Sequence, residues 1–447
     1  MKDGKRGKMM ERNENILERT AAFASEHAGD DCDRLLFNAA KYPGIDMRLA
    51  VDTISGRKRL SRKLPDFAAV DGLLYPGRLC TEQCSSGACA AYKASLVQSL
   101  VPGAVVADIT GGLGADACRM SRVCSRVVCF ERNALLADCV RHNFKVLGRD
   151  NIEVRNEEVS QENIGLLLSA SEPSLVYADP ARRNSGGGRT FSIRDYEPDI
   201  TSFIGDVFRH CRYFLVKISP MEDLDSVFES LPQCREIHVV SYAGECKELL
   251  LVLDRDWPVP VAGKEMQGAV ERSHVAVEKR KRVAVSLSDD GITDIFGFSK
   301  EEEASASPYF LESADEIRPG MVLYVPSPAI LKAGAYNLFA EKFSLTKLDV
   351  STHLYLGRSG EDGEVSGRSC GIPGKAYGII DVFSFDKKSI AEVAGKIKGR
   401  ADVTAKNIPL SSEELARRLK IKSGGGLHVW GCRAAGKNIL LLTERLQ

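Results

Sequence analysis

One stretch constrains this chain more than any other, because it joins the pattern of a buried strand to a glycine-rich turn and then to a helix. It reads Val-Val-Ala-Asp-Ile-Thr-Gly-Gly-Leu-Gly-Ala-Asp over residues 105–116. A short apolar run bounded by glycines is typical of a strand buried in a parallel sheet. The carboxyl end of such a strand is where open α/β sheets bind nucleotides. The stretch therefore predicts a nucleotide-binding turn.

Two classes of cofactor fit the spacing of this turn. Gly112, Gly114 and Ala117 satisfy the loose dinucleotide pattern G-x-G-x-x-A. Asp108, however, stands at the end of the strand, where a pyrophosphate would meet a carboxylate instead of bare backbone N–H groups. S-adenosylmethionine carries an ammonium, a sulfonium and no phosphate, so Asp108 attracts it, and Asp116 adds a second negative charge. We expect S-adenosylmethionine, with a nicotinamide or flavin dinucleotide as the alternative.

The next strand and the segment before the turn supply further contacts to this cofactor. Glu131 follows a strand expected at 126–130 and lies 19 residues after Gly112, which suits a carboxylate that holds both ribose hydroxyls. The segment 82–86 precedes a helix expected at 88–100 and, in this topology, folds over the methionine end of the cofactor. The predicted cofactor-binding residues are Asp108, Thr110, Gly112, Gly114, Asp116, Glu131 and Gln83.

Length and composition place the chain among multidomain globular proteins. With about 150 residues per domain, 447 residues predict two to four domains. No apolar run approaches the roughly 20 residues that span a bilayer, and the first residues are polar, so we expect a cytoplasmic protein. The 13 cysteines are scattered and read as reduced thiols. Cys80, Cys84 and Cys89 lack the spacing and the histidines of a zinc site, so no metal is expected.

The order of elements predicts an N-terminal helical subdomain over 1–95 and an α/β domain over 96–256. Within the α/β domain, apolar strands alternate with helices, and the run 249–253 follows the sixth strand after a short turn. This run is expected to return antiparallel at the edge, which gives the Rossmann-like, seven-stranded methyltransferase topology with a terminal hairpin. The first six strands are expected near 104–108, 126–130, 152–155, 174–178, 213–218 and 236–241.

Two small α+β domains are expected after a proline-rich linker at 257–260. The first, over 275–370, has strands at 283–287, 321–325 and 353–356 and one helix at 329–343. The second, over 375–447, is basic: from residue 376 onward it holds 13 Lys and Arg against 7 Asp and Glu. It is where a polyanion would bind. A second basic run at 57–63 fits a solvated helix face better than a phosphate contact.

Chemistry is expected where the fourth strand ends in Asp179, Pro180, Ala181 and Arg182. Methyl transfer is an in-line displacement that needs position and a nucleophile with a free lone pair. Asp179 and the carbonyl of Pro180 can accept hydrogen bonds from a target nitrogen. Arg182, with Arg183, can hold a phosphate, stack on a base or pair with local acids. Lys217 at the end of the fifth strand either pairs with Asp179 or Glu245 or faces the substrate. The predicted catalytic residues are Asp179, Pro180, Arg182 and Lys217.

The chain resembles the bacterial class I methyltransferase-like proteins that carry a C-terminal THUMP-like domain. The motifs that carry this resemblance are EQCSS at 82–86, DITGGLGAD at 108–116, YADPARR at 177–183, KISPMEDLD at 217–225, GECKELL at 244–250 and NIPLSSEELARRLKIKSGG at 407–425. The resemblance implies a Rossmann-like catalytic domain, a ferredoxin-like domain and a tail similar to RNA-binding THUMP modules. The turn at Asp179 also resembles the D/N-P-P-Y/F/W signature of exocyclic-amino methyltransferases, with Ala181 and Arg182 departing from it.

Together these observations predict an S-adenosylmethionine-dependent methyltransferase that acts on a base nitrogen of structured RNA, such as tRNA or rRNA. Two alternatives remain open. One is a non-catalytic RNA-binding protein that retains a methyltransferase fold. The other is a methyltransferase of a protein or a small molecule.

Overall fold

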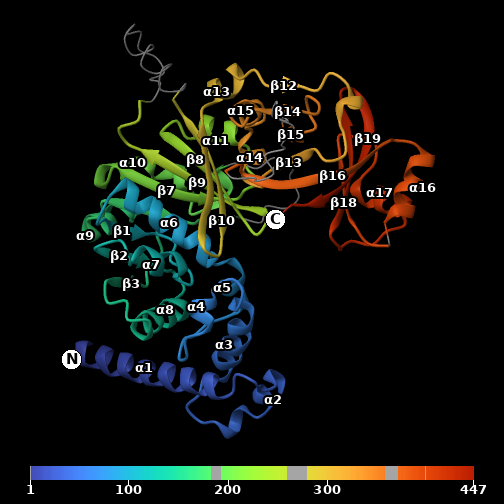
Figure 1. Ribbon diagram of the computed structural model, residues 1–447. Coiled ribbons are helices and arrows are strands. Elements are labelled where there is room, and N and C mark those ends of the chain that lie inside the picture. Colours follow the sequence, from blue (N-terminus) through green and yellow to red (C-terminus); the bar gives the residue numbers. More distant parts are fainter. Residues whose placement is uncertain (1, 183–192, 259–278, 358–370, 398, 447) are drawn as a thin grey trace. The chain divides into compact units, whose positions relative to one another are not determined.

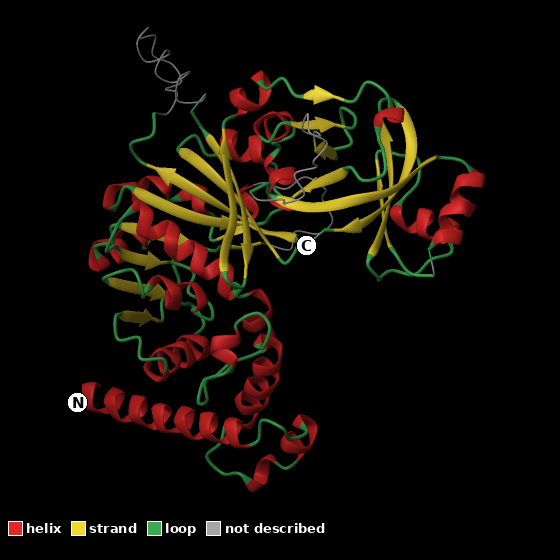
Figure 2. Cartoon of the chain, viewed as in Figure 1, coloured by secondary structure: helices red, strands yellow, loops and turns green. Residues whose placement is uncertain are grey.

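The computed structural model describes residues 2–182, 193–258, 279–357, 371–397 and 399–446 (Figures 1 and 2). The chain divides into two compact units. Unit 1 comprises residues 1–237, 248–276 and 287–292, and unit 2 comprises residues 238–247, 277–286 and 293–447. In the described part of the chain, no helix is long and apolar enough to cross a membrane.

Unit 1 begins with helices, as the N-terminal sequence predicts. Asp31 and Asp46 accept hydrogen bonds from the first turns of α2 and α3 and so fix where these helices begin. Phe23, Met47 and Ile54 pack in a small core between the helices. The elements are α1 (Lys2–Glu26), α2 (Cys32–Phe37), η1 (Ala39–Lys41), α3 (Met47–Leu60), α4 (Pro65–Ala68), α5 (Arg78–Gln83) and α6 (Gly87–Leu100).

Alternating strands and helices follow, at the positions that the apolar runs predict. The strands are β1 (Val105–Asp108), β2 (Arg126–Phe130), β3 (Ile152–Arg155), β4 (Leu175–Ala178), β7 (Tyr213–Ile218), β8 (Cys234–Tyr242) and β9 (Glu245–Asp254). The helices between them are α7 (Ala115–Met120), α8 (Ala134–Val146), α9 (Ile164–Ser171), α10 (Ile204–His210) and α11 (Leu224–Ser230). Short elements after β4 are β5 (Ala181–Arg182), η2 (Ile193–Asp195), β6 (Tyr196–Glu197) and η3 (Ile200–Ser202).

The strand order places the predicted site at a point where the sheet changes direction. The order is β11-β10-β8-β9-β7-β4-β1-β2-β3, and β1 pairs in parallel with both β2 and β4. The chain winds from β1 towards β3 on one side and then crosses to β4 on the other. Open α/β sheets bind ligands outside the carboxyl ends of the strands at such a point. Asp108, the last residue of β1, stands there.

The terminal hairpin differs from the prediction in one respect. The expectation that 249–253 lies at the sheet edge is wrong, because β9 lies between β7 and β8 and pairs antiparallel with β7. Leu249, Leu251 and Leu253 are fully buried, which suits an interior strand. Two further strands, β10 (Lys281–Ser288) and β11 (Gly291–Phe298), follow β8 in the order, so the sheet has nine strands where seven were expected.

Unit 2 contains an eight-stranded sheet with the order β12-β14-β15-β13-β16-β19-β18-β17. Its strands are β12 (Tyr309–Phe310), β13 (Val322–Pro326), β14 (Leu345–Lys347), β15 (Tyr355–Gly357), β16 (Gly374–Ser384), β17 (Asp402–Lys406), β18 (Leu427–Ala434) and β19 (Lys437–Arg445). Its helices are α13 (Lys300–Ser305), η4 (Ala314–Glu316), α14 (Pro328–Ala333), α15 (Asn337–Lys342), α16 (Lys387–Lys396) and α17 (Ser412–Leu419). The single helix expected at 329–343 is two helices, because Gly334 at φ +86° ends α14 in a left-handed conformation.

Candidate functional site

The glycine turn after β1 is shaped by its neighbours as well as by its backbone. A Cβ atom on Gly111 would lie 2.6 Å from the sulfur of Cys129, and one on Gly114 would lie 2.5 Å from the ring of Phe144. Gly112 differs, because a Cβ there would be no closer than 3.7 Å to another residue, but its φ is +54°. Two glycines are thus needed for close packing, and Gly112 shapes an open turn.

Asp108 is a buried carboxylate that lines the cavity. It is 1% exposed, and its Oδ1 accepts hydrogen bonds from the backbone N–H of Thr110 at 3.1 Å and from the Thr110 hydroxyl at 3.4 Å. Burial raises the pKa of Asp108 to about 7, against the hydrogen bonds from Thr110, and the charges of Asp116 and Asp179 add to the rise. A cation bound beside Asp108 would favour its ionised form.

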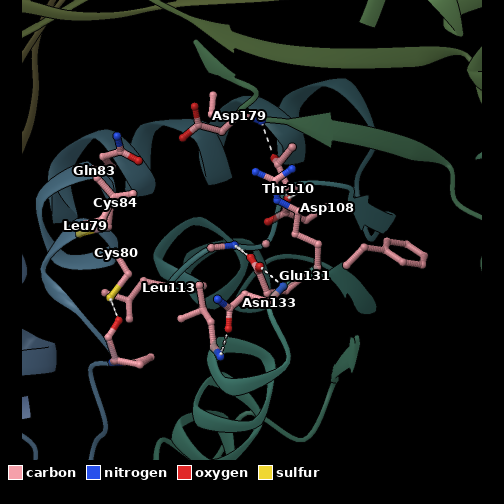
Figure 3. Close-up of a pocket in the computed structure, with 18 of the residues that line it drawn as sticks. Leu79, Cys80, Gln83, Cys84, Asp108, Thr110, Leu113, Glu131, Asn133 and Asp179 are labelled. Atoms are coloured by element: carbon pink, nitrogen blue, oxygen red, sulfur yellow. Dashed lines mark hydrogen bonds between the residues drawn. The ribbon is translucent and has the colours of Figure 1, made fainter. Parts of the chain in front are cut away.

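Glu131 ties the end of β2 to the glycine turn. Its Oε2 accepts a hydrogen bond from the backbone N–H of Gly112 at 2.9 Å, and its Oε1 accepts one from the backbone N–H of Asn133 at 2.7 Å (Figure 3). Each carboxylate oxygen has a second lone pair, so both can still accept a hydroxyl from a bound ligand. The geometry fits the ribose-binding role that we predict for Glu131.

Asp116 lies under the turn and is held by protein donors. Its Oδ2 accepts hydrogen bonds from Ser85 at 2.9 Å and from Tyr177 at 2.8 Å, and its Oδ1 lies 3.0 Å from the ammonium of Lys93. Burial raises the pKa of Asp116, but the lysine charges outweigh it and leave the pKa below its ordinary value. Asp116 is therefore ionised and contributes negative charge to the wall of the cavity.

Asp179 at the end of β4 is clamped at both its backbone and its side chain. Its backbone N–H donates to the Thr110 hydroxyl at 2.6 Å. The Lys217 ammonium donates to both Asp179 oxygens, at 2.8 and 2.7 Å. Burial lowers the pKa of Lys217, but the charge of Asp179 outweighs it and leaves that pKa above its ordinary value. Of the alternatives open for Lys217, the structure has the pair with Asp179.

The rest of the predicted catalytic turn leads away from the sheet. Pro180 is buried, and Ala181 and Arg182 are exposed on β5, where Arg182 stands opposite Tyr196 of β6. Arg183 lies outside the described residues.

A cavity of about 540 Å³ is lined by the glycine turn and by Asp108, Asp116, Glu131 and Asp179. The predicted catalytic residues Pro180, Arg182 and Lys217 are not among its lining residues. Its size falls in the range of small-molecule and cofactor sites. Figure 3 shows Leu79, Cys80, Gln83 and Cys84 on one side of it and Thr110, Asp108 and Glu131 on the other. Helices α3 and α5 of the N-terminal subdomain therefore form one wall, and the glycine turn with the end of β2 forms the other.

The lining of this cavity is acidic. Among the described residues that line it, the cations are Arg132 and Arg48, and Arg132 is paired with Glu158 and Glu197. A pyrophosphate would be repelled here, whereas a cofactor that carries an ammonium and a sulfonium fits. Of the cavity residues that the structure describes, nine are carboxylates: Asp46, Asp52, Asp108, Asp116, Glu131, Glu157, Glu158, Asp179 and Glu197.

The neighbouring cysteines are poor nucleophiles. Burial raises the pKa of Cys80 to about 12 and raises that of Cys84. Within the described ranges, no group of three or more His, Cys, Asp or Glu side chains is placed to hold a metal ion.

Several site residues are missing from the sequence prediction. Ser85, Lys93 and Tyr177 hold Asp116, and Glu248 of β9 lies 3.1 Å from the Lys93 ammonium. Ser85 falls inside the motif at 82–86 and was within reach of sequence reasoning. The ion pair between Lys93 and Glu248 joins residues 155 positions apart, and no local pattern predicts it.

Comparisons with known proteins agree with this fold. Residues 323–361 match a family model described as a ferredoxin-like domain, and residues 374–445 match one described as THUMP domain-like. The crystal structure of a Porphyromonas gingivalis W83 protein, assigned as a methyltransferase, superposes with a TM-score of 0.80 at 29% identity, over 96% of this chain and 98% of that one. This chain has a methyltransferase fold. Two Mycobacterium tuberculosis proteins, from strains CDC 1551 and H37Rv, are also similar to this chain in sequence. Each is named an uncharacterized S-adenosylmethionine-dependent methyltransferase and is 24% identical, over 85% of this chain and 90% of its own length.

Proposed function

We propose that this chain is an S-adenosylmethionine-dependent methyltransferase that modifies a base nitrogen of structured RNA. The observation that carries the first half is the acidic cavity at the sheet switch point, with Asp108, Glu131 and the glycine turn on one wall. The relatives from Mycobacterium tuberculosis, named as enzymes of this kind, support the same cofactor.

Different residues of the cavity would bind different parts of such a cofactor. Asp108 meets the ammonium of the methionine end, Glu131 accepts the ribose hydroxyls, and Gly112 leaves space for close approach. Gln83, Thr110, Gly114 and Asp116 complete the proposed binding set. When bound, S-adenosylmethionine would supply a methyl group for attack by a nucleophile, with the neutral thioether as the leaving group.

The turn at Asp179 prepares the nucleophile. Its carboxylate accepts a hydrogen bond from a target N–H, which orients the nitrogen lone pair and raises its electron density. The Lys217 ammonium donates to both oxygens of Asp179 and so fixes the orientation of the carboxylate. The Asp179 carboxylate can take up the proton that the nitrogen loses when the new C–N bond forms. The Pro180 carbonyl offers a second acceptor, and Arg182 offers a guanidinium to a base or a phosphate.

The RNA half of the proposal rests on unit 2. Its residues 374–445 match the THUMP domain-like family model. In the same segment, Arg400 and Lys422 face each other across an isolated parallel bridge, and both are exposed. Like charges placed side by side destabilise a protein unless an anion binds between them. A phosphate backbone is an anion of this kind.

The N-terminal basic run has a different use. Arg57 donates to the carbonyl of Ala68 at 2.7 Å and pairs with Asp71, and Arg59 donates to the Thr81 hydroxyl at 3.0 Å. These cations hold helices of the N-terminal subdomain together, in keeping with the interpretation that they are not a phosphate site. We therefore assign RNA binding to unit 2.

Methyl transfer from labelled S-adenosylmethionine to total RNA tests the proposal. The wild type is expected to label RNA, and Asp179→Ala to lose the label while keeping its affinity for the cofactor. Ala181 and Arg182 depart from the usual signature, which favours the alternative of a non-catalytic RNA-binding protein. Absence of label from wild type and variant alike would establish that alternative. Label in protein or small-molecule fractions would refute RNA as the substrate.

A further inference from the structure

Three charged side chains are buried together behind the glycine turn, and we call Lys93, Asp116 and Glu248 the buried triad. Lys93 is 0% exposed and Glu248 2% exposed. The Lys93 ammonium lies 3.0 Å from Asp116 Oδ1 and 3.1 Å from Glu248 Oε2, and it donates to the Ser85 hydroxyl at 2.6 Å. The triad connects three distant segments: α6, α7 and β9.

With both of its carboxylates ionised, the triad carries one more negative charge than positive. It holds one ammonium and two carboxylates, and the nearby pair of Lys217 and Asp179 is neutral by itself. Glu248 Oε1 is buried and has no hydrogen-bond partner among the residues that the structure describes. Burial raises the pKa of Glu248, while the charge of Lys93 opposes the rise. No described cation balances the remaining charge.

A net charge out of contact with water is unfavourable in the empty protein. It becomes favourable when a cation occupies the neighbouring cavity, because electrostatic attraction is stronger in a protein interior than in water. Asp116 is both a member of the triad and a residue of the cavity wall, so the charge acts on whatever the cavity holds. The cofactor that we propose is cationic at sulfur before methyl transfer and a neutral thioether after it.

We propose that Glu248 determines the selectivity of the cavity for the charged cofactor over its neutral product, by giving the buried triad a net negative charge. This inference rests on the proposed function. Glu248 does not line the cavity and acts through Lys93 and Asp116, so it is a specificity residue and not a catalytic one. The same charge would favour release of the thioether product after each transfer.

Calorimetric titration of the full chain with S-adenosylmethionine and with S-adenosylhomocysteine tests this inference. Glu248→Gln keeps the size of the side chain and an oxygen acceptor for Lys93 but removes the charge. One unit charge acting across about 10 Å at an effective dielectric of about 20 corresponds to roughly a tenfold change in affinity. Affinity for S-adenosylmethionine should therefore fall about tenfold, and affinity for S-adenosylhomocysteine should change less than about twofold. Equal loss for both ligands, or loss for neither, would overturn the inference.

A matched control lies on the same strand. Asp254 is also buried on β9, but it pairs with Arg212 and stands opposite the first residue of β7, at the other edge of the sheet. Asp254→Asn removes the same charge and should leave the ratio of the two affinities unchanged. A ratio that falls equally in this control would also overturn the inference.

Removing charges from the triad one at a time separates electrostatics from folding. Lys93→Met raises the net negative charge and should widen the preference for S-adenosylmethionine. The double variant with Glu248→Gln restores the wild-type net charge and should restore the wild-type ratio. A ratio that follows thermal stability instead of net charge refutes the proposal. If the wild type binds neither ligand, the proposed function itself is refuted. This result differs from one in which the wild type binds both ligands but the variants leave the ratio of the two affinities unchanged, which refutes only the inference about Glu248.

Discussion

Replacing Asp108 by asparagine should stabilise the cofactor-free protein and weaken cofactor binding. The pKa of Asp108 is about 7, against an ordinary value of 3.8. Each pH unit of that difference corresponds to about 1.4 kcal/mol, so ionising this buried carboxyl costs the folded state about 4 kcal/mol. Asparagine can still accept the hydrogen bonds from Thr110.

The sign of the pH dependence follows from the raised pKa. Asp108 is protonated in the folded protein below pH 7 and in the unfolded chain only below about 4. The contribution of Asp108 to stability is therefore most favourable at low pH and becomes less favourable as pH rises towards 7. Above pH 7, Asp108→Asn should unfold with a free energy up to about 4 kcal/mol higher than wild type. Near pH 4 the two should converge, as denaturant unfolding at each pH would measure.

Cofactor affinity should run in the opposite direction. An ammonium binds the ionised form of Asp108, which makes up about 9% of the free protein at pH 6 and about 91% at pH 8 when the pKa is about 7. Wild-type affinity should therefore be roughly tenfold weaker at pH 6 than at pH 8. Calorimetry in two buffers of different ionisation enthalpy should detect about half a proton released per cofactor at pH 7.

The asparagine variant is also the control for the cofactor's own amino group. Any titration that remains in Asp108→Asn belongs to the ligand, and subtracting it isolates Asp108. A wild-type affinity with the same pH dependence as the variant, together with equal stability at pH 8, would refute the role that we give this carboxylate.

Three further predictions concern the glycine turn, the ion pair between Lys217 and Asp179, and the exposed cations Arg400 and Lys422. Gly114→Ala should lower the free energy of unfolding by about 1–3 kcal/mol in thermal melts, because φ is +77° and the added methyl group meets a ring; an unchanged melting temperature would contradict this packing. Lys217→Met should reduce kcat far more than it raises KM for the cofactor, with partial recovery in Lys217→Arg, whereas a loss confined to KM would place Lys217 outside the chemistry. Arg400→Glu with Lys422→Glu should weaken RNA binding at low salt and flatten its salt dependence in filter-binding assays, and an unaltered salt slope would move the RNA site elsewhere.

Most of the central sheet could be predicted from the sequence. Each apolar run that we identify between 104 and 254 is a strand, because strands buried on both faces have a continuous apolar signature. The position of β9 could not be predicted, since an apolar run records burial and not which strands lie beside it. The break at Gly334 was also missed, because the residues on both sides of it continue a helical pattern.

The candidate site divides in the same way. Asp108, Glu131 and Asp179 stand at the ends of strands, so their convergence on one edge follows from parallel topology. The structure also places Gln83 and Gly112 at the cavity that they form. Lys93 reads in the sequence as an ordinary helical lysine, and only the fold shows that it is buried. The roles of the predicted site residues in binding and catalysis remain predictions, as do the domain limits at 95, 256 and 375.

The central claim is that an acidic cavity at the switch point selects a cationic nucleoside cofactor. Titrating the full chain in a calorimeter with S-adenosylmethionine and, separately, with NAD tests this claim most directly. We predict saturable binding of S-adenosylmethionine that weakens in Asp108→Asn at pH 8, and no binding of NAD. Saturable binding of NAD, with no response to S-adenosylmethionine, would contradict it.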